Sequence, residues 1–331
     1  MKGLVVAVIF AATSLHAQVV ATTSRGVAVA DDQKLQLFDN SRMMWSSTGV
    51  SAPSRIVVGR DRIALLDSLN NRVRIADLAT GRGEELETGE TPIDGIFVGR
   101  DLFILERDAK TLERFGPDGS RNRLALASDP VFIRESGGML YVYSRLEGVV
   151  QEIAPSPLAI TRRFQLAPFA SDFEVAGSTG YLVFPREAKL RLIDLKSMKA
   201  AGDIDAGAVP VDVSITRDGN ALSATGVTIA DPSAKRIWTI EGRQSLTAAV
   251  TRGFIRGLLG LGLFAPRSSD FPTGVDRVFT DGFAYDTTTG TLYRSRRGNV
   301  RVVAKGVAPY GFAVTNRGIM VWKDGTLHLL E

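Results

Sequence analysis

The amino-acid sequence predicts an all-β protein built from repeated units of about 40 residues. Seven prolines recur along the chain, at five intervals of 37 to 42 residues and one interval of 62. A short apolar run follows each proline, and turns rich in glycine or charged residues separate it from further short runs. The prolines are Pro53, Pro92, Pro130, Pro168, Pro210, Pro272 and Pro309.

The unit that begins at Pro53 shows the pattern most clearly. It predicts strands over Arg55–Val58, Arg62–Leu66 and Arg72–Ala76, and a weaker fourth strand after Thr80-Gly81. Four short antiparallel strands per unit are typical of a blade of a β-propeller. Dividing the residues after position 17 by the period gives about eight units, so seven and eight blades are both compatible with the sequence. A β-sandwich is the alternative fold, and it does not explain the proline spacing.

The second strand of each unit is a continuous apolar run, whereas the third alternates apolar and polar residues. We therefore expect the second strands to be buried on both faces. The residues predicted to lie in this core are Ile63, Leu65, Phe103, Leu105, Tyr141, Val142, Leu182, Val183 and Val321.

The first 17 residues have the pattern of a secretory signal peptide. Lys2 precedes an apolar run from Leu4 to Ala12, and Leu15 and Ala17 occupy the cleavage positions. This predicts a secreted or periplasmic protein whose single propeller domain spans residues 18–331. A buried N-terminal strand and an uncleaved anchor are the alternatives. No later run is long enough for a transmembrane helix.

Composition excludes several kinds of site. The chain has no cysteine, which excludes disulfides and zinc–thiolate centres, and only two histidines, His16 and His328. A formal net charge of +4 is too small to indicate a nucleic-acid binder.

Two segments, Asn71–Asp77 and Lys189–Asp194, resemble the blade repeats of NHL and YVTN-type propellers, as does Thr91–Val98. The resemblance implies the propeller fold over nearly all of the chain after the signal peptide. Those families include ligand-binding proteins, adhesion scaffolds, lactonases and lyases, so the resemblance leaves the function open. The related lyases use histidine-bound metal, which this chain is poorly equipped to supply.

The candidate ligand-binding residues lie where each unit enters its innermost strand, because these strands line the central channel of a propeller. Arg55 and Asp94 lie two residues after their prolines, as does Asp212, while Asp172 and Asp276 lie four residues after theirs. The aspartates could form a ring in the channel that binds a divalent cation such as calcium. One of them could instead act as a general base. Alternatively they cap neighbouring loops through backbone hydrogen bonds. Arg55 could bind an anionic ligand or pair with one of these acids.

A glycine-rich apolar insertion near residues 250–270 accounts for the longest proline interval. It is interpreted either as a cover packed on the propeller or as a contact surface for a partner.

Together these observations predict an exported β-propeller that binds or scaffolds a small molecule, glycan or protein at one end of its channel. No cofactor motif is present. The alternative is a metal-assisted hydrolase of the lactonase kind, with one aspartate as base, but we favour a protein that is not an enzyme.

Overall fold

The computed structural model describes residues 19–205 apart from 32 and 40, and then parts of the remaining chain. Those parts are 212–215, 221–224, 228–231, 236–239, 275–279, 283–286, 290–296, 299–308, 311–315, 318–323 and 325–330. The predicted signal peptide and the apolar insertion near 250–270 lie outside the described residues. No helix that could cross a membrane occurs within the described ranges.

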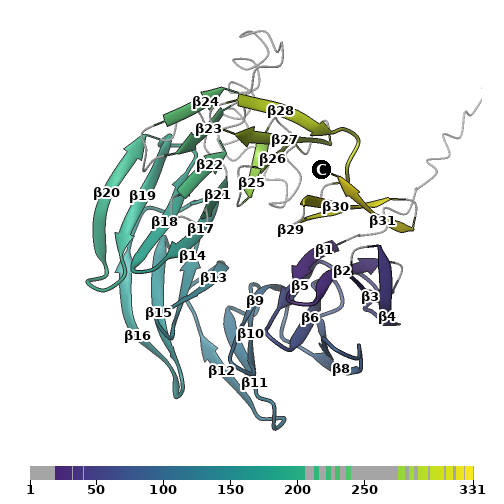
Figure 1. The fold of residues 1–331 in the computed structure, drawn as a ribbon. Coiled ribbons are helices and arrows are strands. Elements are labelled where there is room, and N and C mark those ends of the chain that lie inside the picture. Colours follow the sequence, from purple (N-terminus) through teal and green to yellow (C-terminus); the bar gives the residue numbers. More distant parts are fainter. Residues whose placement is uncertain are drawn as a thin grey trace, which may run out of the picture.

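The described strands form eight antiparallel sheets, which we number in chain order (Figure 1). Sheet 1 contains β1 (Val19–Thr23), β2 (Gly26–Asp31), β3 (Lys34–Asp39) and β4 (Arg42–Thr48). Sheet 2 contains β5 (Arg55–Val58), β6 (Arg62–Asp67), β7 (Arg72–Asp77) and β8 (Gly83–Glu87). Sheet 3 contains β9 (Pro92–Val98), β10 (Asp101–Glu106), β11 (Thr111–Phe115) and β12 (Arg121–Ala125). Sheet 4 contains β13 (Pro130–Ser136), β14 (Met139–Ser144), β15 (Val149–Pro155) and β16 (Leu158–Gln165).

The second half of the chain continues the same order. Sheet 5 contains β17 (Asp172–Ala176), β18 (Thr179–Phe184), β19 (Lys189–Asp194) and β20 (Lys199–Asp205). Sheet 6 contains β21 (Asp212–Ile215), β22 (Ala221–Ala224), β23 (Thr228–Asp231) and β24 (Arg236–Thr239). Sheet 7 contains β25 (Val275–Phe279), β26 (Phe283–Asp286), β27 (Thr291–Arg296) and β28 (Asn299–Ala304). Sheet 8 contains three described strands, β29 (Phe312–Thr315), β30 (Gly318–Lys323) and β31 (Thr326–Leu330).

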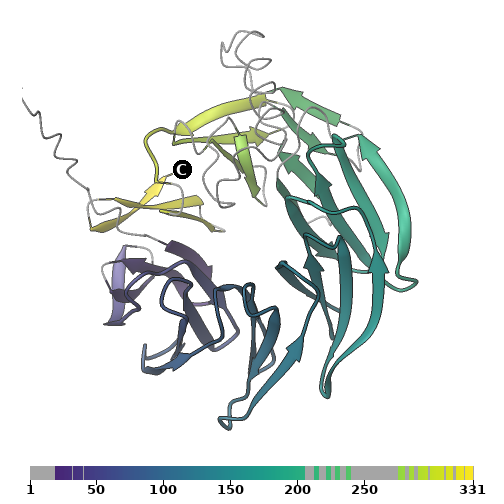
Figure 2. The same cartoon turned by 180° about the vertical axis from the view of Figure 1, so that it is seen from behind.

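The sheets are arranged radially in a ring, which both views show (Figures 1 and 2). The first strand of each sheet faces the centre, and from sheet 1 to sheet 7 each inner strand packs beside the next. The all-β propeller prediction is therefore confirmed. Because every sheet has the same topology, all inner strands start at one end of the channel, which we call the linker end. The turns between first and second strands lie at the opposite end.

The repeat is also visible in the backbone. In seven of the described sheets, the residue immediately before the third strand has a positive φ. Several of these residues are not glycine; φ is 56° for Asn71 and 55° for Lys110. The seven residues are Gln33, Asn71, Lys110, Gly148, Ala188, Gly290 and Gly325. A left-handed residue at this point lets a tight turn bring the third strand back beside the second.

The hydrophobic core lies between neighbouring sheets. All nine second-strand residues that the sequence places in the core are buried, so that prediction is confirmed. Leu65 packs in a cluster shared by sheets 1 and 2, and Phe103 packs in one shared by sheets 3 and 4. Within the described residues, sheets 1 to 5 each contribute apolar side chains to both of their neighbours, which is why their central strands are apolar on both faces.

The two ends of the described ring meet through side chains. β1 lies beside β29, and a cluster containing Phe38 and Trp322 joins sheets 1 and 8. The aromatic side chains of Phe38 and Trp322 lie 5.4 Å apart between ring centroids. The indole N–H of Trp322 donates to Asp31 Oδ2 at 3.0 Å. No described sheet mixes strands from the two ends of the chain.

Candidate functional site

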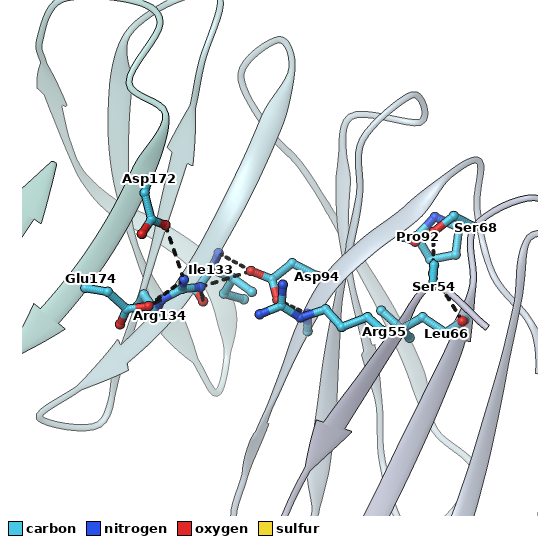
Figure 3. A network of polar contacts seen from close by, with 11 residues as sticks. Ser54, Arg55, Leu66, Ser68, Pro92, Asp94, Ile133, Arg134, Asp172 and Glu174 are labelled. Carbon is cyan, nitrogen blue, oxygen red and sulfur yellow. Dashed lines mark hydrogen bonds and ion pairs between the residues drawn. The ribbon is translucent and has the colours of Figure 1, made fainter. Parts of the chain in front are cut away.

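The candidate residues lie on inner strands near the linker end of the channel. Arg55, Asp172 and Asp212 are the first residues of β5, β17 and β21, and Asp94 is the third residue of β9. Asp276 is the second residue of β25, but the environment of its side chain lies outside the described part of the chain. The structure connects three of the five, Arg55, Asp94 and Asp172, through one set of polar contacts (Figure 3).

Asp94 is the centre of this set. Its side chain is almost completely buried, and Oδ1 lies 2.9 Å from Nε of Arg55 on the preceding inner strand. Oδ2 accepts a hydrogen bond from Nη1 of Arg134, on the following inner strand β13, at 3.0 Å. Asp94 therefore joins sheets 2, 3 and 4 at the channel wall.

Arg134 extends the contacts to sheet 5. Its Nη2 lies 2.7 Å from Oε1 of Glu174 on β17 and 3.9 Å from Oδ1 of Asp172. The Arg134 side chain also lies over the ring of Phe132, with 5.9 Å between Cζ and the ring centroid. We call Arg55, Asp94, Arg134, Asp172 and Glu174 the channel network.

Both aspartates of the channel network also bind backbone amides in the same way. Asp94 Oδ1 accepts the N–H of Gly95 at 2.8 Å, and Oδ2 accepts the N–H of Ile133 in the next sheet at 3.3 Å. Asp172 repeats this with the N–H of Phe173 at 2.8 Å and, in the next sheet, of Val213 at 2.9 Å. Each carboxylate thus ties the start of its inner strand to the following sheet.

A second polar chain links sheets 2 and 3 beside Arg55 (Figure 3). Ser54 Oγ donates to Ser68 Oγ at 2.7 Å and lies 3.1 Å from the carbonyl oxygen of Leu66. Ser68 Oγ donates in turn to the carbonyl of Pro92. The backbone that leads into Arg55 and Asp94 is therefore held by hydrogen bonds.

The buried charges shift the pKa values of this network. Burial alone would lower the pKa of Arg134, but the carboxylates of Glu174, Asp94 and Asp172 outweigh it and raise that pKa. Burial raises the pKa of Glu174, with Asp172 acting in the same direction, and the guanidinium of Arg134 counteracts this only in part. Arg134 is thus a permanent cation whose loss would leave three carboxylates close together.

These contacts decide how well the network suits a metal ion. Both oxygens of Asp94 and of Asp172 are directed at N–H donors, a geometry that stabilises a carboxylate without a cation. Throughout the described residues, no group of three or more histidine, aspartate or glutamate side chains lies where it could hold a metal ion. The donor set of the described network therefore does not fit a divalent cation such as calcium.

The sequence reasoning missed Arg134 and Glu174. They lie two residues after Phe132 and Asp172, on the same face of their strands, because successive side chains of a strand alternate between its faces. Comparing units at a single position could not find them. A comparison that also included the residue two places further on would have paired Arg134 with Glu174 in adjacent units.

Comparisons with known proteins identify the fold. The sequence matches no known family, and it matches no curated protein. Among solved structures, the chain is similar to the designed propeller Ika8, with a TM-score of 0.66 and 10% identity over 94% of this chain and 95% of that one. It is similar to BamB from Moraxella catarrhalis, with a TM-score of 0.62 and 9% identity over 93% and 92%. For virginiamycin B lyase from Staphylococcus aureus the TM-score is 0.61, with 12% identity over 84% and 94%. At these identities the likeness is one of fold.

Proposed function

We propose that this β-propeller is a binding or scaffolding protein whose ligand docks at the linker end of the central channel. The proposal rests on the exposure of the Arg55 side chain and on its contact with Asp94. Its side chain is 46% exposed, yet its Nε is held against the buried carboxylate of Asp94. An exposed cation that is fixed in place suits recognition of an anionic group, because little conformational entropy is lost when the ligand binds.

Arg55 keeps hydrogen-bonding capacity for such a ligand. A guanidinium has five N–H donors, and Arg55 directs its Nε at Asp94. The oxygens of Asp94 also accept hydrogen bonds from Gly95, Ile133 and Arg134, so they have little capacity left for the other donors of Arg55. The terminal nitrogens of Arg55 can therefore bind a carboxylate, phosphate or sulfate group in bidentate fashion. The ligand is a small molecule, an acidic glycan or a protein segment that carries such a group.

The contacts of the aspartates support binding over metal-assisted hydrolysis. A general base or metal ligand needs a free carboxylate oxygen, whereas Asp94 and Asp172 direct theirs at backbone and arginine donors. A double variant, Asp94→Asn/Asp212→Asn, tests this in calorimetry with and without calcium. We expect the variant to be less stable than the wild type and calcium to shift the unfolding temperature of neither. A calcium-dependent rise in the wild type that the variant lacks would favour the hydrolase.

We also propose that the blades are of the NHL or YVTN type and that the protein is exported after removal of residues 1–17. The first proposal is supported by the equivalent places of Asp77 and Asp194, which end third strands. Their Oδ1 atoms accept the N–H of Ala79 at 2.9 Å and of Lys196 at 3.0 Å, so the two turns have the same form. Mass spectrometry of the exported protein tests the second proposal, since an intact Met1 would contradict it.

The ligand-binding proposal is tested with Arg55→Gln, which removes the charge and keeps a polar side chain. A thermal-shift screen of acidic oligosaccharides, acidic peptides and their neutral counterparts is run on the wild type and the variant. We expect only acidic compounds to stabilise the wild type, and Arg55→Gln to abolish the effect. Arg163→Gln on β16 is the matched control, because Arg163 is also exposed but lies on an outer strand. Equal responses in all three proteins would contradict the proposal.

A further inference from the structure

We infer that the opposite end of the ring carries a second binding site, for a small organic anion with an apolar ring. A pocket of about 540 Å³ lies between sheets 2 and 3 at the turns that join their first and second strands. Its walls include Gly59, Arg60 and Asp61 from sheet 2 and Phe97 and Arg100 from sheet 3. The volume is within the range of pockets that hold small molecules. The site is separate from the channel network, since Arg55 begins β5 and Arg60 lies in the turn that follows its other end.

One wall of the pocket is aromatic. The ring of Phe97 packs directly on the backbone at Gly59, where a Cβ atom would lie only 2.8 Å from Cγ of Phe97. The half-buried Phe97 also packs against the core cluster of sheets 2 and 3, so its ring is supported from behind. A flat apolar group can stack on the part of the ring that faces the pocket.

The rim of the pocket is positively charged. Arg60 and Arg100 are exposed, and within the described ranges no carboxylate forms an ion pair with either. Asp101, which follows Arg100, is paired instead with Arg114 at 2.8 Å. With Asp61, the pocket has two cations and one anion, which favours a ligand with a single acidic group.

The sheet 2 wall is rigid before any ligand arrives. Within its turn, the N–H of Gly59 donates to the carbonyl of Arg62 at 2.8 Å. Ser24 Oγ from sheet 1 donates to the carbonyl of Arg60 at 3.3 Å, and the N–H of Leu78 donates to the carbonyl of Asp61 at 2.9 Å. The turn is therefore held from two sides, which reduces the entropy lost on binding.

The chemistry of the walls selects the ligand class. A planar apolar body would contact Phe97, and a carboxylate, sulfonate or phosphate on that body would reach Arg60 and Arg100. A neutral analogue would lose the charge-assisted hydrogen bonds, and an inorganic anion would lose the apolar contact. Both parts of the ligand are therefore needed for measurable affinity.

The experiment uses 2-naphthoate as the probe and its neutral analogue 2-naphthalenemethanol as the reference, each titrated calorimetrically into the full chain. We expect saturable binding of 2-naphthoate with one site, and binding at least about tenfold weaker for 2-naphthalenemethanol. The Arg60→Gln/Arg100→Gln variant should also bind 2-naphthoate at least about tenfold more weakly. Both arginines are exposed, so this variant is expected to fold, and its unfolding temperature is measured alongside.

A control variant identifies the site. Arg163→Gln changes an exposed arginine on an outer strand, and it should bind 2-naphthoate as the wild type does. No saturable binding by the wild type, or unchanged binding by the Arg60→Gln/Arg100→Gln variant, would overturn the inference. Either result leaves the linker-end proposal intact, because that proposal is tested with Arg55→Gln and different ligands.

Discussion

Arg134 on β13 and Asp94 on β9 form an ion pair between neighbouring inner strands, with 3.0 Å between Nη1 and Oδ2. The pair is central to the channel network because each partner has a further contact on its other side. Asp94 contacts Arg55 in sheet 2, and Arg134 contacts Glu174 in sheet 5. Alternating charges therefore connect four consecutive sheets around the channel. Such a chain of contacts fixes the positions of the sheets relative to one another and holds Arg55 in place.

Replacement of Arg134 by glutamine should destabilise the protein strongly. It leaves the carboxylates of Asp94, Asp172 and Glu174 close together without their shared cation, and loss of one partner of a buried pair typically costs about 3–5 kcal/mol. Chemical denaturation measures this change in the free energy of unfolding. Arg134→Gln/Glu174→Gln should recover part of the loss, because it removes one of the stranded charges. A loss below about 1 kcal/mol would show that the network contributes little to stability.

The stability of the protein should depend on pH through Glu106. This side chain is buried at the end of β10, where it accepts the N–H of Gly89 at 2.5 Å and the hydroxyl of Thr111. Burial, together with the neighbouring Glu113, raises its pKa from 4.5 to about 7. Between these values the folded protein retains a proton that the unfolded chain has lost, so the free energy of unfolding should fall as pH rises through this window.

The Glu106→Gln variant tests the assignment of this pH dependence. Glutamine retains the acceptor for the Gly89 N–H and cannot ionise, so the variant should be more stable relative to the wild type at about pH 8 than at about pH 5. Thermal unfolding of both proteins across the range measures the difference. A difference that stays constant with pH would assign the dependence to another group.

Two leucines in the middle of sheet 2 allow a controlled test of the core. Leu65 on β6 is fully buried, whereas Leu69 in the following turn is 82% exposed. Leu65→Ala should cost about 2–5 kcal/mol of unfolding free energy, because a cavity is left in a packed interior. Leu69→Ala should change it by less than about 0.5 kcal/mol. Similar effects of the two substitutions in chemical denaturation would mean that the strand register is wrong.

The core was predictable from the sequence, whereas most contacts of the channel network were not. The second strands are apolar on both faces, and this local pattern places Leu65 and Phe103 in the interior whichever sheets become their neighbours. The pairing of Asp94 with Arg134 joins residues 40 positions apart and requires the angular placement of adjacent sheets. Sequence spacing identified Asp94 as a residue at the channel but could not show which donors it meets. Closure of the ring has the same origin, since Phe38 and Trp322 come together only in the complete fold.

The junction between sheets 1 and 8 should be a weak point when Trp322 is truncated. Trp322→Ala removes the contact with Phe38 and the hydrogen bond to Asp31, at an expected cost of about 3–5 kcal/mol. Hydrogen exchange should accelerate in β1–β2 and β29–β30 more than in sheets 3 and 4, because local opening begins where contacts are lost. Trp322→Phe keeps an aromatic ring at this place and should have a smaller effect. Uniform acceleration over the described strands would show instead that the ring unfolds as one unit.

Each described sheet consists of strands that are consecutive in the chain, and the linkers from sheet 1 to sheet 5 are short. No described pair of hydrogen-bonded strands therefore depends on which sheet comes first in the chain. A circular permutation that opened the linker between sheets 3 and 4, residues 126–129, would leave every described sheet uncut. It would, however, make the junction between Asp94 and Arg134 the new closure of the ring. The channel network would then have to hold together the two ends of the polypeptide, a task that sheets 1 and 8 now perform with an aromatic pair.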